Sequence, residues 1–123
     1  MAITVPSFLL KRVYAKGSLC NNEGGFQFDL KNSLGSGYAK ELFPLILDGQ
    51  EVPKEKSFFI LEGKEICFTA VCPETPFTLT KNKASTILVK GVTLSAGAHK
   101  LGIGFVVQGI GKLQFDVTDT VAV

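Results

Sequence analysis

The fold is decided by the stretch Gly25-Phe26-Gln27-Phe28-Asp29-Leu30-Lys31-Asn32. Its apolar residues lie at every second position and its polar residues lie between them. Successive side chains of an extended strand point to opposite faces, so the phenylalanines and the leucine share one face. A period of two with one polar face is typical of a half-buried β-strand. The stretch therefore predicts a strand with one face against a core.

Similar short apolar segments follow along the chain and are separated by turn residues. Asp48-Gly49 lies between apolar flanks and predicts a β-hairpin, because both residue types tolerate a positive φ. Glu62-Gly63 predicts a second hairpin, between residues 57–61 and 65–71. Other strands are expected at residues 8–14, 42–47, 77–80, 85–90, 100–107 and 112–117. No long window shows the three-and-four spacing of an amphipathic helix.

Many short strands without a long helix bury their apolar faces best as two packed sheets. The sequence therefore predicts an all-β fold, an antiparallel two-sheet immunoglobulin-like β-sandwich, with a small β-barrel as the alternative. The 123 residues suit a single domain over positions 1–123. The chain has no Trp, so it lacks the Cys–Trp–Cys pattern of antibody domains.

Composition and charge argue against several classes of partner. The net charge is +2, and the 13 basic and 11 acidic residues are interspersed, so we expect no nucleic-acid partner. No stretch approaches the roughly 18 to 20 apolar residues of a membrane helix, so we expect no membrane partner. The N-terminal residues lack the charged start of a secretory signal. The three cysteines are an odd count, which fits a reducing compartment and a cytoplasmic protein.

No catalytic, cofactor-binding or metal-ligating residue is predicted from the sequence. His99 is the one histidine, and we expect it to fix its turn through a hydrogen bond to the backbone. Gly102-Ile103-Gly104 and Gly109-Ile110-Gly111 resemble nucleotide fingerprints, but no helix follows either segment. We therefore expect no cofactor and no catalysis by the isolated chain. A hydrolase or lyase built on the scattered carboxylates is the alternative.

Three segments carry apolar residues at successive positions: residues 42–47, 58–61 and 102–107. Adjacent residues point to opposite faces, so each segment places some apolar side chains away from the core unless loops cover them. Exposed apolar patches usually mark contacts with a partner. The predicted contact residues are Leu42, Phe43, Leu45, Phe58, Phe59, Leu61, Gly102, Gly104 and Phe105. This pattern favours a protein-interaction subunit over a small-ligand or carbohydrate-binding module, which needs a concave pocket.

The order of several segments resembles the small β subunits of bacterial C-glycoside deglycosidases. The residues that carry the resemblance are Gly25 to Asn32, Leu45 to Pro53, Glu62-Gly63-Lys64 and Leu94 to His99. In that family a β-sandwich subunit pairs with a larger barrel subunit, which holds a divalent metal and performs the chemistry. The resemblance implies a non-catalytic accessory subunit that assembles with itself or with a larger metal-dependent catalytic subunit. It implies no catalytic residue in this chain.

Overall fold

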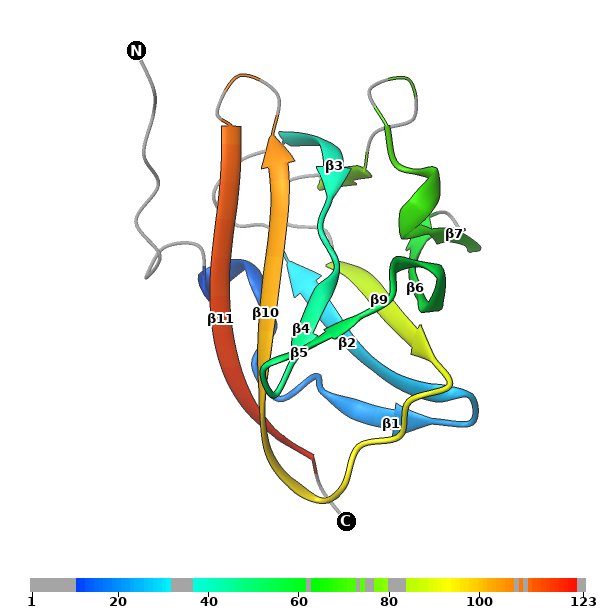
Figure 1. Ribbon diagram of the computed structural model, residues 1–123, viewed down its shortest axis with the longest axis vertical. Helices are drawn as coiled ribbons and strands as arrows, with labels where there is room; N and C mark the ends of the chain where they lie inside the picture. Colours follow the sequence, from blue (N-terminus) through cyan, green and yellow to red (C-terminus); the bar gives the residue numbers. More distant parts are fainter. Residues whose placement is uncertain are drawn as a thin grey trace.

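We describe the protein from a computed structural model (Figure 1). The structure describes residues 11–31, 37–61, 63–72, 74, 77–79, 84–107, 109 and 111–121. These residues form two antiparallel sheets and three short 3₁₀ turns, with no α-helix among them. The turns are η1 (Lys11–Val13), η2 (Lys54–Lys56) and η3 (Phe68–Ala70).

The first sheet has five strands in the order β1-β2-β9-β6-β7. Their bounds are β1 (Cys20–Asn22), β2 (Gly25–Lys31), β9 (Ala84–Lys90), β6 (Ser57–Leu61) and β7 (Lys64–Cys67). The predicted strand at residues 25–32 is β2, and its three apolar side chains are at most 3% exposed. Its alternation therefore places one face on the core, as the sequence predicts.

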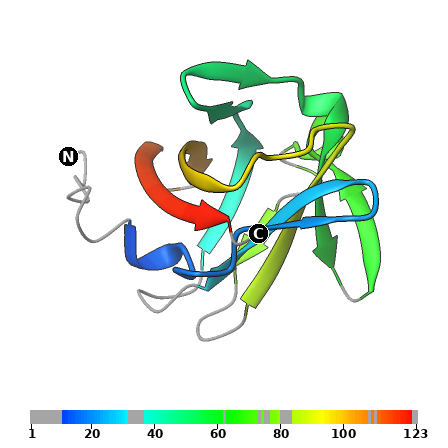
Figure 2. The ribbon, with the colours of Figure 1, turned by 90° about the horizontal axis from the view of Figure 1, so that it is seen from below.

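The second sheet has six strands, and the long strand β10 (Gly97–Val107) lies at its centre. The order β5-β4-β10-β3-β8 uses β5 (Gln50–Val52), β4 (Leu45–Leu47), β3 (Gly37–Leu42) and β8 (Phe77–Leu79). On its other side, β10 pairs with β11 (Gly111–Val121) along its full length. β11 lies on one side of the molecule and β6 on the other (Figures 1 and 2).

The two sheets pack face to face and do not close into a barrel, which confirms the predicted antiparallel sandwich. Aromatic rings fill the space between them. Phe59 of the first sheet lies 4.5 Å from Phe77 of the second, measured between ring centroids. Within the second sheet, Phe105 and Phe115 meet edge to face at 6.5 Å. Such tilted contacts stabilise a core beyond the area they bury.

Several predicted strand limits are wrong, for local reasons. The expected strand at residues 42–47 is divided, because Pro44 has no N–H to donate and lies between β3 and β4. The expected return strand at residues 65–71 ends at Cys67. The 3₁₀ turn η3 follows it and turns Phe68 into the core beside Phe59. Of residues 8–14, residues 8–10 lie outside the described part of the chain, and Lys11–Val13 form η1 rather than a strand.

Both predicted hairpins are confirmed. Asp48 and Gly49 have φ of 50° and 86° and join β4 to β5, and Gly63 has φ of 81° between β6 and β7. Positive φ at both central residues matches the twist of the two strands. Within the described ranges, no helix is long and apolar enough to cross a membrane.

Candidate functional site

A row of apolar side chains lies on the outward face of the first sheet. Phe58 on β6 pairs with Leu88 on β9, and both are half-buried. Their neighbours Phe59 and Ile87 are 2% and 1% exposed, so they point inward and Phe58 and Leu88 point outward. Ile60, two residues beyond Phe58, is also half-buried on this face. We call Phe58, Ile60 and Leu88 the apolar row.

Charged side chains border the apolar row. The Lys90 Nζ lies 4.6 Å from the centroid of the Phe58 ring and 2.8 Å from Glu65 Oε1. Both charged side chains are well exposed, and such surface pairs contribute little to stability. An apolar centre with a charged margin is the usual composition of a protein interface.

The outward face of the second sheet is covered by side chains of the same chain. Gly102 and Gly104 are buried there. A Cβ atom on Gly102 would lie 3.0 Å from the Ile46 Cβ, and one on Gly104 would lie 3.1 Å from the Phe43 Cδ2. Lys112 Nζ in turn lies 4.9 Å from the centroid of the Phe43 ring. The two glycines therefore make room for Ile46 and Phe43, within the domain.

The contact residues predicted from the sequence divide between the core and the outward faces. Four are core residues, each at most 4% exposed: Leu42, Leu45, Phe59 and Phe105. Phe43 and Phe58 are half-buried and lie on the outward faces of different sheets. The side chain of Leu61 lies outside the described residues. The contact surface stays a prediction, with Phe58 as its outward aromatic residue on β6.

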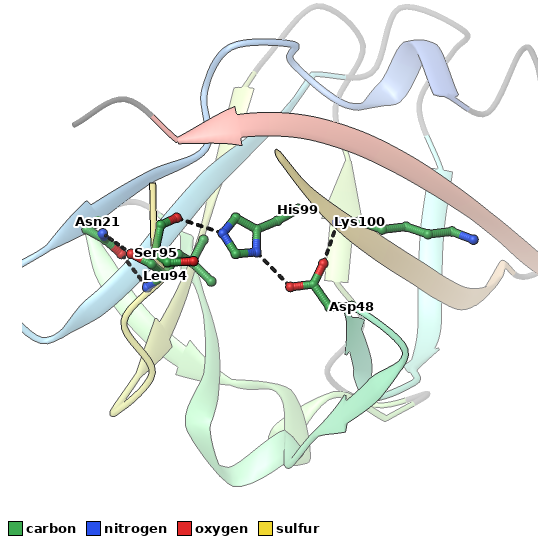
Figure 3. Close-up of polar contacts among 6 residues, drawn as sticks. All are labelled: Asn21, Asp48, Leu94, Ser95, His99 and Lys100. Atoms are coloured by element: carbon green, nitrogen blue, oxygen red, sulfur yellow. Dashed lines mark hydrogen bonds and ion pairs between the residues drawn. The ribbon is translucent and has the colours of Figure 1, made fainter. Parts of the chain in front are cut away.

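His99 joins two loops at one end of the sandwich (Figure 3). Its Nε2 lies 2.7 Å from the backbone oxygen of Ser95, and its Nδ1 lies 2.7 Å from Asp48 Oδ2. The other carboxylate oxygen of Asp48 accepts a hydrogen bond from the Lys100 N–H at 2.9 Å. The expected bond from His99 to the backbone of its turn is present. The link to Asp48 in the β4–β5 turn was not predicted.

The two partners of His99 determine its protonation. A backbone oxygen and a carboxylate both accept hydrogen bonds only, whereas a neutral imidazole has one N–H. Both bonds form together only when the ring is protonated. Two hydrogen bonds accordingly raise the pKa of His99, the one to Asp48 more than the one to the Ser95 backbone. The hydrogen bond from the Lys100 N–H, and to a smaller extent the one from His99, lower the pKa of Asp48.

Asn21 fixes the same loop from the first sheet (Figure 3). Its side chain donates to the backbone oxygen of Leu94 at 2.8 Å and accepts from the Leu94 N–H at 2.9 Å. The loop before β10 is thus held by Asn21 on one side and by His99 on the other. The sequence analysis did not predict this role of Asn21. The only indication in the sequence is the residue type, because Asn side chains readily form hydrogen bonds to the backbone.

A second carboxylate, Asp119, is 7% exposed and pairs across the sheet with His99. Its Oδ2 accepts bonds from the Tyr14 hydroxyl at 2.6 Å and the Gly17 N–H at 2.8 Å, and its Oδ1 accepts from the Thr120 N–H. Burial favours a raised pKa, but these bonds outweigh it and lower the pKa of Asp119. Burial and the Asp119 bond raise the pKa of Tyr14.

A hollow of about 210 Å³ lies on the outward face of the second sheet beside Gly102. It is lined by Ile46, Gly49, Lys100, Gln114 and Asp116. Its volume falls short of the roughly 300 to 1,000 Å³ of small-molecule sites. Among the described residues, no group of three or more His, Cys, Asp or Glu side chains is placed to hold a metal ion.

Two comparisons with known proteins bear on the family. A family model described as "Hydroxymethylglutaryl-CoA reductase, N-terminal domain" matches residues 9–122. A search of curated proteins found no match to this chain.

The family match corrects the resemblance to the small subunits of C-glycoside deglycosidases, which is wrong. That resemblance rested on turn segments such as Asp48-Gly49 and Glu62-Gly63, which serve the same purpose in any antiparallel sandwich. The matched family is a different one, and the match covers nearly the whole chain. The chain belongs to the family of hydroxymethylglutaryl-CoA reductase N-terminal domains.

Proposed function

We propose that this domain is a non-catalytic interaction domain and that the apolar row contacts a larger catalytic polypeptide. The observation that carries the proposal is the presence of Phe58, Ile60 and Leu88 on an outward sheet face. Elsewhere on this sheet the outward positions of β2 carry Gln27 and Asp29, as expected of a face in water. Large apolar side chains gathered on such a face favour a contact.

The family name supports a particular partner. A domain named as the N-terminal part of hydroxymethylglutaryl-CoA reductase accompanies a catalytic part, and we propose that part as the partner. Lys90 and Glu65 place a positive and a negative charge beside the apolar row. This favours a partner whose contact surface also carries charges of both signs at its margin. The domain contributes contact surface, and the partner contributes the chemistry.

The hydrogen bonds of the titratable side chains support a structural role for them. Asp48, His99 and Asp119 each bond to backbone or to one another, in ways that hold turns in place. The hollow beside Gly102 gives little support to the ligand-binding alternative, because it is smaller than most ligand sites. We also propose a cytoplasmic location, which Cys20 and Cys67 support because both are free thiols.

Binding measured by titration calorimetry tests the proposal, with the full chain and the catalytic part of a hydroxymethylglutaryl-CoA reductase from the same host. We expect binding in the micromolar range or tighter, and no reductase activity from the chain alone. Phe58→Asp should abolish binding and leave the circular dichroism spectrum unchanged. Thr118→Asp, an exposed position on the second sheet, is the matched control and should bind normally. Unchanged binding by Phe58→Asp would contradict the proposal.

A further inference from the structure

β11 forms one edge of the second sheet. Within the described ranges it pairs with β10 and with no other strand, and its pairing runs from Gly111 to Val121. Figure 1 shows β11 at the outer side of the sheet. An edge strand presents a row of backbone N–H and C=O groups to a further strand, and proteins either protect such edges or use them.

The hydrogen bonds of β10 show which of its backbone groups face β11. The N–H and C=O of Lys100 both bond to Asp48, and the C=O of Gly104 accepts from the Phe43 N–H. The backbone groups of Lys100, Gly102 and Gly104 therefore face β4 and the residues directly before and after it. The odd-numbered residues of β10 face β11, because backbone groups alternate sides along a strand.

The same alternation identifies the open groups of β11. The odd-numbered residues of β10 pair with odd-numbered residues of β11, such as Ile103 with Phe115. The N–H and C=O groups of Lys112, Gln114 and Asp116 consequently point to the open edge. All three side chains lie on the outward face and are exposed.

The far end of this edge is closed by the chain itself. The Thr120 N–H, which faces the edge, is bonded to the Asp119 carboxylate at 2.8 Å. The Gly17 N–H and the Tyr14 hydroxyl bond to the same carboxylate, so the segment after η1 packs at this end. Among the described residues, the part of the edge that no strand or loop covers is the half from Gly111 to Val117.

We propose that two copies of this chain pair through the open half of β11, antiparallel and about a two-fold axis at Gln114. Antiparallel pairing about Gln114 sets Lys112 of each copy opposite Asp116 of the other. Each opposed pair exchanges two backbone hydrogen bonds, since these residues face the edge. Opposite charges directly across an antiparallel pair are favourable, whereas like charges are not. The edge is therefore complementary to itself in charge and in hydrogen bonding.

The inward face of the edge supports the same register. Leu113 and Val117 are only half-buried, although they pack against the core. In the paired form Leu113 of each copy lies opposite Phe115 of the other, in a pair whose side chains approach closely. A second copy would extend the apolar core past the present edge and cover these side chains. The pairing rests on the proposed function as an interaction domain, and it uses a surface separate from the apolar row.

Sedimentation equilibrium of the full chain tests the proposal. We expect a dimer at micromolar concentration. Lys112→Glu or Asp116→Lys alone should weaken the dimer about tenfold, because each places like charges opposite one another at two symmetric positions. The double variant Lys112→Glu/Asp116→Lys should restore dimerisation. A monomeric wild-type protein, or single variants that dimerise as well as the wild type, would overturn the proposal.

A backbone variant tests the edge itself. Gln114→Pro removes the N–H on the two-fold axis, at an edge position where proline is tolerated, and should give a monomer. Gln114→Ala keeps the N–H and is the matched control, which should remain a dimer. Equal dimerisation of both variants would also overturn the pairing. Phe58→Asp should leave the dimer intact, so loss of catalytic-partner binding and loss of self-association are separate results.

Discussion

Asp48 and Asp119 both anchor a turn to the second sheet, but they differ in exposure and in the side chain that faces them. Asp48 lies in an exposed turn and faces His99, while Asp119 is 7% exposed and faces Tyr14. A tyrosine hydroxyl is protonated at neutral pH, and burial and the Asp119 bond raise the pKa of Tyr14 still further. The Asp119 anchor is therefore constant near neutrality, whereas the Asp48 anchor depends on a proton at His99.

The largest expected effect is on the buried anchor. Asp119→Asn replaces an acceptor of three hydrogen bonds by an amide that also carries donors, so at least one of Tyr14, Gly17 and Thr120 loses its partner. These bonds are buried or part-buried, and a donor left unpaired there costs about 1–3 kcal/mol in the free energy of unfolding. Urea unfolding measures this loss. Glu51→Gln, the same carboxylate-to-amide change at an exposed position of the second sheet, is the control and should change stability by less than about 0.5 kcal/mol. Equal effects of the two substitutions would show that Asp119 is not an anchor.

A smaller effect is expected at the exposed anchor. Asp48→Asn keeps a side chain that tolerates the positive φ of 50°, so the turn itself remains favourable. The variant loses the carboxylate that accepts from both His99 and Lys100. We expect a melting temperature below that of the wild type but above that of Asp119→Asn. Thermal unfolding by circular dichroism measures the order, and the reverse order would contradict the comparison.

The smallest effect is a dependence on pH, which separates the two anchors. The pKa of His99 is raised, so its contribution is complete below about pH 6.5 and is lost as the pH rises through the folded value. The pKa of Asp48 is lowered, so its contribution is present above about pH 4 and is lost as the pH falls through its folded value. The Asp48–His99 anchor is thus most favourable between about pH 4 and pH 6.5.

His99→Gln measures this dependence against the wild type. The difference in free energy of unfolding between the two proteins should shrink as the pH is raised above about 6.5. An NMR titration of His99 should give a pKa above that of a free histidine. A stability difference that stays constant from slightly acidic to alkaline pH would show that the second N–H of the ring contributes nothing.

The sequence predicted the sandwich because alternation depends on local spacing, and β2 and both hairpins followed from it. It left open whether Phe58 or Phe59 faces outward. That choice is made by the register of β6 on β9, where Phe59 pairs with the buried Ile87. The bond of His99 to its own turn was also predictable, since Ser95 is four residues away. The bond from His99 to Asp48 joins residues 51 positions apart, and no local pattern marks it.

The β10–β11 hairpin also bears on how the chain folds. Its two strands are joined by residues 108–110, yet they stay paired along the whole length of both. Closing so short a loop costs little chain entropy, while β3 and β4 reach β10 only after far longer loops are closed. We therefore expect this hairpin to form early and to present β10 as a template for the rest of its sheet. The φ of Gly109 is 87°, a conformation that favours glycine. Substituting Gly109 should therefore change the rate of folding more directly than substituting the turn glycines elsewhere.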